Sequence, residues 1–382
     1  MTSGTNKVDI RPEVGILSVL RHLNYKPWFA LAEFVDNSLQ SYLQNRTKLE
    51  QVDNGQFKLK VSITLDRDGG QIIARDNAAG ISEADYPRAF RPAALPPDRT
   101  GLAEFGMGMK SAACWFSKRW SVRTSALGEP IERIVRLDIG TIVRDSLQEL
   151  KVESSPCRDR DHFTEIVLSD LNSIPQTQTI AKIKRHLTSI YRVFIREGIL
   201  ELCLNDELLE YSEPGVLCVS YHKTPAGDPC DWRKEIDFDF GQGLKAKGFA
   251  ALLTTGSTSG AGFALFRRKR LIQGSGDETY RPEQIFGKPN SYRYQRLFGE
   301  LQLEGFDVSH TKDGFRWDGN EETFLELLRE HLDAEPLPLL DQAENWRSRR
   351  KPSDWREGAI AASRYEHYRE FLEEIIARPP RY

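Results

Sequence analysis

The sequence predicts an α+β fold, and three observations lead to this prediction. Residues 27–49 carry apolar side chains at helical spacing, a run of strand-like segments follows, and helical periodicity returns after residue 320. Helices placed before and after a run of strands favour layers in which helices cover one face of a sheet. A length of 382 residues, with 39% hydrophobic and 29% charged residues, indicates two or three folded domains.

The expected elements follow the chain in order. In the first half we expect helices at 12–22, 27–49 and from about residue 109, and strands at 58–66, 71–76, 119–126, 132–138 and 163–168. In the second half we expect a helix at 178–195, strands at 199–206, 246–254, 261–273 and 299–308, and helices within 320–382. Residues 88–109 hold three prolines and three glycines and predict a long loop, which in a compact domain usually has a function.

Composition excludes several classes of protein. The longest apolar runs reach five residues, so no membrane span is expected, and the N-terminus does not resemble a secretory signal. Five cysteines without a CxxC pair, and scattered histidines, argue against a disulfide framework or a zinc site and favour the cytoplasm. A net charge of −3 excludes bulk coating of nucleic acid but leaves local basic patches open.

The first candidate site residues lie on the helix predicted at 27–49. Glu33, Asp36 and Asn37 have i, i+3 and i+4 spacing, so they share one helix face. Two carboxylates and an amide on one face can polarise a water molecule and give an oxygen ligand to Mg²⁺. A polar helix face turned to solvent is the alternative interpretation of the same pattern.

A second candidate group follows the strand at 71–76. Asp76 ends that strand, and the small residues after it lead to Gly80. A carboxylate there can accept a hydrogen bond from an exocyclic amine, while small residues let a flat base approach the backbone. An Asx turn that simply ends the strand is the alternative. Thr164 is of interest only through its position in a strand, where threonine is common.

A glycine-rich segment begins at Gly101 and leads into the next predicted helix. Gly106 and Gly108 lie directly before Lys110 and Ser111. The first amides of a helix are unpaired and point out from its end, so this segment can cradle a phosphate. The sequence has neither a GxxxxGK[ST] pattern nor a dinucleotide fingerprint here, and a helix start with flexible glycines is the alternative.

In combination these segments resemble the motifs of one superfamily. EFVDN at 33–37, DNAAG at 76–80, GLAEFGMGMKSA at 101–112 and Thr164 follow the order typical of the GHKL ATPases, which comprise DNA gyrase B, the ninety-kilodalton heat-shock chaperones, the sensor histidine kinases and MutL. The similarity is strongest to the MutL and MORC branch, over roughly residues 10–330, although Ala78 stands where the family usually has glycine. The resemblance implies a Bergerat-type α/β sandwich, a transducer-like α/β domain and a short helical C-terminal segment.

The resemblance also implies roles for individual residues. Glu33 would be the general base that activates water, and Asn37 would bind Mg²⁺. Asp76 would accept a hydrogen bond from the adenine of ATP, with Thr164 supporting it through a water and Gly80 bordering the base. The nucleotide lid would run from Gly101 to Ser111, and its phosphate-binding amides would be those of Phe105, Gly106, Met107, Gly108, Met109 and Lys110.

A lysine of the second domain completes the implied site. Lys312, within SHTKDGFRW, resembles the transducer lysine that reaches the γ-phosphate of ATP in this family, and a solvated surface lysine is the alternative. The implied organisation is an N-terminal arm at 1–26 that crosses between protomers, an ATPase domain at 27–172, a transducer-like domain at 173–320 and a helical segment at 321–382.

The expected partners follow from charge and resemblance. Residues 243–300 hold ten basic and four acidic residues, and the run Arg267–Arg270 could neutralise DNA phosphates, with a solvated sheet edge as the alternative. The resemblance implies an ATP-dependent homodimer and, in bacteria, a MORC- or MutL-like component of a phage-defence or restriction-type system with partner nucleases or helicases. A nucleotide-gated clamp or scaffold with negligible turnover is the alternative function, and a client-binding chaperone fits less well because an acidic linker and a long middle domain are missing.

Overall fold

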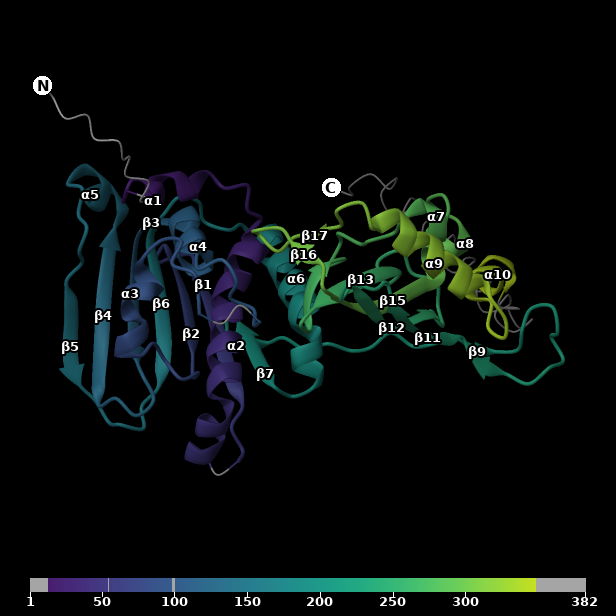
Figure 1. Ribbon diagram of the computed structural model, residues 1–382, viewed down its shortest axis with the longest axis horizontal. Helices are drawn as coiled ribbons and strands as arrows, with labels where there is room; N and C mark the ends of the chain where they lie inside the picture. The colour runs from purple at the N-terminus through teal and green to yellow at the C-terminus, as the bar shows by residue number, and fades with distance from the viewer. Residues whose placement is uncertain (1–12, 54, 98–99, 348–382) are drawn as a thin grey trace, which may run out of the picture.

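The computed structural model describes residues 13–53, 55–97 and 100–347, and these residues form two sheets with helices packed against them (Figure 1). An eight-stranded sheet lies in the first half of the chain, and a five-stranded sheet lies in the second half. The α+β prediction, with one α/β unit following another, is therefore confirmed.

The first unit joins a mixed sheet to a set of helices. Its helices are α1 (Ile16–Val19), η1 (Leu20–His22), α2 (Pro27–Val52), η2 (Glu83–Asp85), α3 (Tyr86–Phe90), α4 (Gly108–Phe116), α5 (Ile139–Arg144) and α6 (Thr177–Arg196). Its strands are β1 (Leu59–Asp66), β2 (Gln71–Asp76), β3 (Ser117–Ser125), β4 (Ile131–Asp138), β5 (Val152–Pro156), β6 (Phe163–Leu171), β7 (Leu200–Leu204) and β8 (Glu207–Leu208). Their order across the sheet is β5-β4-β3-β6-β2-β1-β7-β8.

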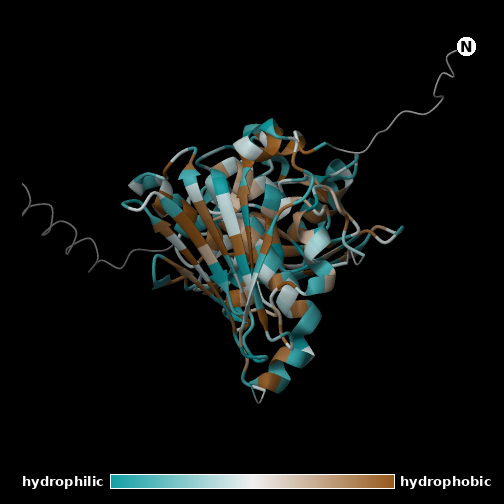
Figure 2. Ribbon diagram, turned by 90° about the vertical axis from the view of Figure 1, so that its left-hand side faces the viewer, coloured by the Kyte–Doolittle hydropathy of each residue, from teal (hydrophilic) through white to brown (hydrophobic). Residues whose placement is uncertain are grey.

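One face of this sheet carries the core. Side chains of β1 alternate between buried and more exposed positions, as the period of two in a strand requires, and Figure 2 shows the same alternation of apolar and polar residues across the sheet. Helices α2, α4 and α6 supply the other half of this core, with Leu31, Leu39 and Ile190 all fully buried. Pro27 suits the first turn of α2, where its missing N–H costs nothing.

The first sheet extends beyond the boundary that the sequence suggested. Strand β7 pairs in parallel with β1, from Leu59 opposite Leu200 to Ile63 opposite Leu204, and the same core continues to Leu209. A parallel partner must return by a crossover, which here is α6. The boundary predicted between residues 172 and 173 therefore falls inside the sequence of this sheet, not at its end.

The second unit is built on the five-stranded sheet, in the order β11-β12-β15-β13-β14, with two short hairpins beside it. Its strands are β9 (Cys218–Val219), β10 (Cys230–Asp231), β11 (Arg233–Asp239), β12 (Lys245–Leu252), β13 (Gly262–Arg267), β14 (Arg270–Gln273), β15 (Leu297–Glu304), β16 (Asp307–Val308) and β17 (Phe315–Arg316). Its helices are α7 (Glu283–Phe286), α8 (Tyr292–Arg296), α9 (Glu321–Asp333) and α10 (Leu339–Asn345).

The single strand predicted at 261–273 is wrong. The segment is a tight hairpin in which β13 and β14 pair antiparallel and Arg267 lies opposite Arg270. Arg268 and Lys269 form its two-residue turn with φ of 52° and 67°. Turns of this kind usually hold Asn-Gly because both central residues adopt positive φ. Two basic residues in these places gave no turn signal in the sequence.

Helix α6 connects the two units. Its residues Ile190 and Phe194 belong to the core of the first unit, whereas Val193 packs with Ala264 and Phe266 of β13. In Figure 1 the helix lies at the junction, between the strands of the first sheet and the hairpin β16–β17. The two units therefore share one helix, so a movement of either sheet would require α6 to repack.

The two ends of the chain were predicted to form an arm and a helical segment. Within the arm at 1–26, the described residues pack on their own chain: the indole of Trp115 in α4 donates a 3.0 Å hydrogen bond to the carbonyl of Leu23. Residues 1–12 and 348–382 lie outside the described residues, and α9 and α10 are the described helices of the segment 321–382. Within the described ranges, no helix combines the length and the apolar character needed to cross a bilayer.

A buried histidine of α6 forms hydrogen bonds with the second unit. The His186 ring stacks on Trp28 at a centroid distance of 4.0 Å, and its Nδ1 lies 2.8 Å from the Ser275 hydroxyl. Its Nε2 lies 2.9 Å from Asp277, while Lys182 faces the same carboxylate at 3.4 Å. Burial lowers the pKa of the imidazole, although the hydrogen bond to Asp277 opposes this effect.

This junction makes stability depend on pH. Because the folded pKa of His186 is below its unfolded value of about 6.5, the unfolded state binds more protons at mildly acidic pH. We expect the free energy of unfolding to fall between pH 7.5 and pH 5.5, as measured by urea denaturation. His186→Gln should flatten this dependence, and equal slopes for the two proteins would contradict the prediction.

Candidate functional site

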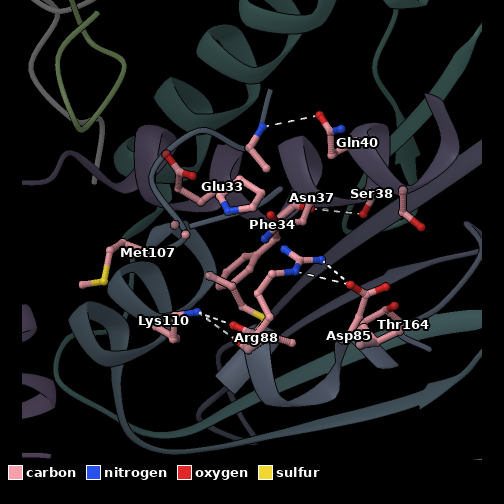
Figure 3. Close-up of a pocket in the computed structure, with 18 of the residues that line it drawn as sticks. Glu33, Phe34, Asn37, Ser38, Gln40, Asp85, Arg88, Met107, Lys110 and Thr164 are labelled. Atoms are coloured by element: carbon pink, nitrogen blue, oxygen red, sulfur yellow. Dashed lines mark hydrogen bonds and ion pairs between the residues drawn. The ribbon is translucent and has the colours of Figure 1, made fainter. Parts of the chain in front are cut away.

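A cavity of about 300 Å³ opens between α2, the end of β2 and the segment before α4. Figure 3 shows residues of α2 along one side of it, with Lys110, Arg88 and Asp85 opposite. Its wall includes most of the residues singled out in the sequence, namely Glu33, Asn37, Asp76, Gly80, Phe105, Gly106, Met107, Gly108, Met109, Lys110, Thr164 and Lys312. Folding therefore brings segments more than 270 residues apart in sequence to one site.

Of the three polar residues predicted on one face of α2, Glu33 and Asn37 line this cavity and Asp36 does not. Glu33 is 3% exposed and Asn37 is half-buried, and both line the cavity. The Oε1 atom of Glu33 is buried and has no hydrogen-bond partner. Asp36, 1% exposed, instead contacts the second unit. The cavity thus contains one carboxylate oxygen without a partner, which is suited to receive a hydrogen bond from water.

Asp76 also lines the cavity, at the end of β2. Its carboxylate accepts hydrogen bonds from the Ser38 hydroxyl at 2.6 Å, the Ala78 amide at 2.9 Å and the Thr164 amide at 3.2 Å. Burial raises the pKa of Asp76, although these hydrogen bonds oppose the shift. Three donors orient the group, and Thr164 lies directly opposite it in the β2–β6 ladder. A fixed acceptor at the base of a cavity can select an amine-bearing ring.

The turn after Asp76 requires glycine at one place. Gly80 has φ of +72°, and a Cβ there would lie 2.0 Å from the carbonyl oxygen of Ser125. Ala78 is fully buried and is not one of the described non-glycine residues with positive φ, so alanine fits its backbone. The departure from the usual family glycine therefore leaves the turn intact.

Two glycines keep the other wall close to α2. Gly106 has φ of +64°, and a Cβ there would lie 2.1 Å from the carbonyl oxygen of Ala94. A Cβ on Gly108 would lie 2.1 Å from Oε2 of Glu33. Because α4 begins at Gly108, its first backbone amides stand at the cavity, next to the Glu33 carboxylate. This arrangement suits an anion with several oxygens.

Three other residues of this segment have structural contacts. The Lys110 ammonium donates to the carbonyl of Ala89 at 2.9 Å, and burial, followed by the charge of Arg88, lowers its pKa to about 8. Gly101 lies outside the cavity wall, and a Cβ there would meet the side chain of Gln40 at 2.0 Å. Ser111 is also outside the wall, fully buried, with no partner for its hydroxyl. Of the lid residues, Gly106, Gly108 and Lys110 therefore line the cavity, whereas Gly101 and Ser111 do not.

Lys312 reaches the cavity from the second unit. It lies in the turn of the hairpin β16–β17 and is 5% exposed. Its Nζ donates to Oε2 of Glu33 at 3.1 Å and to Oδ2 of Asp36 at 2.7 Å. Burial lowers the pKa of this amine, but the charges of Asp36 and Glu33 more than offset burial, so the pKa is raised. The lysine is therefore a buried cation and not a solvated one.

The basic run at 267–270 has other partners than those expected. Arg270 is 1% exposed and forms an ion pair with Asp36, while Arg267 and Arg268 both form ion pairs with Glu104 of the lid. Lys269 is half-exposed and pairs with Glu197 at 2.7 Å. A DNA-binding stripe through all four residues is wrong, because the hairpin turns at 268–269 and directs most of these charges into the junction.

The sequence singled out Asp36 but did not show which residues contact it. Asp36 accepts a hydrogen bond from the Tyr191 hydroxyl at 2.7 Å and from Nε of Arg270 at 2.9 Å. His310 lines the cavity and its ring lies 5.4 Å from that of Phe105. A signal for Asp36 existed in its i+3 spacing from Glu33. The tyrosine and the arginine gave none, because their partners lie more than 150 residues away.

The comparisons with known proteins cover the first unit. A family model described as "Histidine kinase-, DNA gyrase B-, and HSP90-like ATPase" matches residues 25–166. This segment is a GHKL ATPase domain. It includes α2, β2, the lid and Thr164, which are the parts that meet at the cavity, whereas Lys312 lies outside the match. A search among curated proteins found no match. Membership in the superfamily indicates ATP binding and hydrolysis, typically with Mg²⁺, and GHKL proteins commonly dimerise.

The residues present fit a magnesium nucleotide. Residues with three suitable features line one cavity: Glu33 has a buried oxygen without a partner, Gly108 brings the start of α4 close to that carboxylate, and Asp76 is an oriented acceptor. The amide oxygen of Asn37 is a hard ligand of the kind Mg²⁺ takes together with phosphate oxygens and water. No cluster of three or more His, Cys, Asp or Glu side chains able to hold a metal occurs among the described residues.

Lid order should depend on Glu104. Its side chain is 13% exposed and forms ion pairs with both Arg267 and Arg268. Arg268 also donates a hydrogen bond to the carbonyl of Gly101. Breaking a buried ion pair leaves an unpaired charge, so Glu104→Gln should speed amide hydrogen exchange across 100–109 by at least about tenfold. Mass spectrometry of exchanged peptides measures this change.

A matched control for this prediction is Glu197, at the C-terminal end of α6, which pairs with Lys269 of the same hairpin. Glu197→Gln removes the partner of Lys269, whose ion pair is largely solvated, and should leave the exchange of 100–109 unchanged. Equal exchange in Glu104→Gln and the native protein would show that the lid does not depend on this ion pair.

Proposed function

We propose that this protein binds ATP with Mg²⁺ in the cavity and hydrolyses it slowly to ADP and phosphate, with its nucleotide state gating homodimerisation. One observation carries the proposal: the Lys312 ammonium of the second unit lies 3.1 Å from Glu33 of the GHKL domain inside the cavity. A cation and a carboxylate at one point beside the amides of α4 are suited to stabilise charge on a phosphoryl group.

In the proposed reaction each residue has a separate task. Asp76 accepts a hydrogen bond from the adenine amine, and the amides at Gly106–Lys110 hold the phosphates. Glu33 takes a proton from a water molecule. The oxygen of that water bonds to the γ-phosphorus as the bond between the γ-phosphorus and the β,γ-bridging oxygen breaks. Lys312 neutralises charge on the γ-phosphoryl oxygens. Mg²⁺, held by Asn37 and the phosphates, would neutralise the remaining negative charge.

The proposed biological role is that of a MORC- or MutL-like component of a bacterial phage-defence or restriction-type system that acts on DNA. The resemblance of the sequence motifs supports this role, and the excess of basic residues in 243–300 is consistent with DNA contact. Within the run Arg267–Arg270, Arg270 cannot take part in that contact because it is buried, whereas Lys269 is half-exposed. Partner nucleases or helicases would then provide the cleavage or unwinding activity.

A nucleotide-gated scaffold with negligible turnover is the alternative function. One observation favours this alternative: the Lys312 ammonium has two carboxylate partners, Glu33 and Asp36. Its release would then accompany nucleotide binding and reposition the second unit. Turnover rates measured beside nucleotide-dependent oligomer state separate the two functions.

Replacing the base should separate hydrolysis from binding. Glu33→Gln keeps the shape of the side chain but removes its charge, so we expect kcat to fall by at least about 100-fold. ATP should still bind, and the dimer should accumulate with ATP. Phosphate release and size-exclusion chromatography with ATP, ADP and a non-hydrolysable analogue measure these outcomes.

Glu50 supplies the matched control for Glu33. It lies near the end of α2 and pairs with Arg46 in an exposed ion pair, so Glu50→Gln should hydrolyse ATP at the native rate. Native turnover in Glu33→Gln would rule out Glu33 as the base. Absence of turnover in the native protein, with ATP-dependent dimers, would favour the scaffold.

Nucleotide affinity should depend on the acceptor at Asp76. Asp76→Asn presents an NH₂ group to a site already surrounded by donors, so we expect ADP affinity to fall by at least about tenfold, measured by isothermal titration calorimetry. Asp68→Asn, in the exposed turn between β1 and β2, should bind ADP normally. Unchanged affinity in Asp76→Asn would place the base elsewhere in the cavity.

A further inference from the structure

Arg270 is one of the largest fully buried side chains in the described chain, with 1% of its surface exposed. It is the first residue of β14, directly after the two-residue turn of the β13–β14 hairpin. Arginine is rarely buried to this degree unless its charge is paired. Arg270 does not line the cavity, so any effect that it has on bound nucleotide must pass through other residues.

The guanidinium of Arg270 holds two parts of the site at once. Its Nε donates to Oδ1 of Asp36 at 2.9 Å, and its Nη1 donates to the backbone carbonyl of Lys312 at 3.1 Å. Asp36 in turn accepts the ammonium of Lys312 at 2.7 Å. Arg270 thus binds the backbone of Lys312 directly and, through Asp36, the end of its side chain. The donors of a planar guanidinium stand at fixed positions and match these two acceptors, whereas the ammonium of a flexible lysine has no such fixed geometry.

The backbone of Lys312 needs such support. It has φ of +52°, a left-handed conformation that is unfavourable for a residue with a side chain. The turn is closed by the Lys312 amide, which donates to the carbonyl of Ser309 at 2.9 Å. The hydrogen bond from Arg270 to the Lys312 carbonyl fixes the peptide on the other side. Residues held in strained conformations by surrounding contacts are frequent at functional sites.

Arg270 also changes how tightly the carboxylates hold Lys312. Asp36 shares its charge with Arg270 and with the Tyr191 hydroxyl at 2.7 Å, whereas Glu33 keeps one oxygen without a partner. Two anions, Glu33 and Asp36, face two cations, Arg270 and Lys312. Without Arg270, both anions would depend on Lys312 alone, and the lysine would be held more strongly away from a phosphate.

We propose that Arg270 is a positioning residue of this site: it fixes the backbone of Lys312 and neutralises Asp36, so that the Lys312 ammonium can leave the carboxylates for a phosphate of the nucleotide. This inference rests on the proposed ATPase function and deepens it. It makes the β13–β14 hairpin, and not only the loop that carries Lys312, part of the apparatus that sets turnover.

The test uses the full chain and a double-mutant cycle. Arg270→Lys keeps the charge and loses the planar guanidinium, so kcat should fall about tenfold while ADP affinity stays within about twofold of native. In a Lys312→Met background the same substitution should change kcat less than about twofold, because residues that act through one group are not additive. Lys269→Ala, on the same hairpin but paired only with surface Glu197, should keep native turnover.

A second measurement does not depend on activity. Amide hydrogen exchange of 309–314 should become at least about fivefold faster in Arg270→Lys and remain native in Lys269→Ala. Additive effects in the cycle, or equal losses of kcat and ADP affinity, would reduce Arg270 to a structural role. If the native protein does not hydrolyse ATP, the proposed function fails by itself, and unchanged exchange of 309–314 in Arg270→Lys would then overturn the positioning role separately.

Discussion

A buried cluster of four charges holds the two units of this protein in register. Glu33 and Asp36 come from α2, and Arg270 and Lys312 come from two hairpins of the second unit, with none of the four more than 5% exposed. Charges removed from water are costly unless each meets an opposite charge and further hydrogen bonds. The units must therefore dock in one arrangement, because any other arrangement leaves a buried charge without its partner.

The same cluster gives the candidate site its chemistry. A carboxylate that is buried and partly without partners can take a proton, and a lysine beside it can follow the negative charge of a phosphoryl group. The lysine does not belong to the GHKL domain, since the family match ends at residue 166 and Lys312 lies far beyond it. The docking of the two units thus depends on four side chains, two of which, Glu33 and Lys312, also line the candidate site.

One hairpin contacts both α2 and the segment before α4. The β13–β14 turn carries Arg270 to Asp36 and Arg267 and Arg268 to Glu104 of the lid. Arg268 and Lys269 both have positive φ, which costs about 1–2 kcal/mol for each residue with a side chain. The ion pair of Arg268 with the largely buried Glu104 opposes this strain. The hairpin therefore keeps an unfavourable backbone because its contacts across the junction require that shape.

Local patterns in the sequence determined much of this protein. Helical spacing predicted α2 and placed Glu33 and Asn37 on it, alternation predicted β1 and β2, and the motif order identified the cavity residues from Asp76 to Lys110. These features depend on neighbours a few positions apart, which a sequence displays directly. Only the tertiary structure decided that β7 completes the first sheet, that 261–273 is a hairpin, and that Arg270 faces Asp36 instead of solvent. The reason is physical: an arginine in a basic run looks the same whether water or a buried carboxylate meets its charge, and that partner, 234 residues away in sequence, is set by the packing of two sheets around α6.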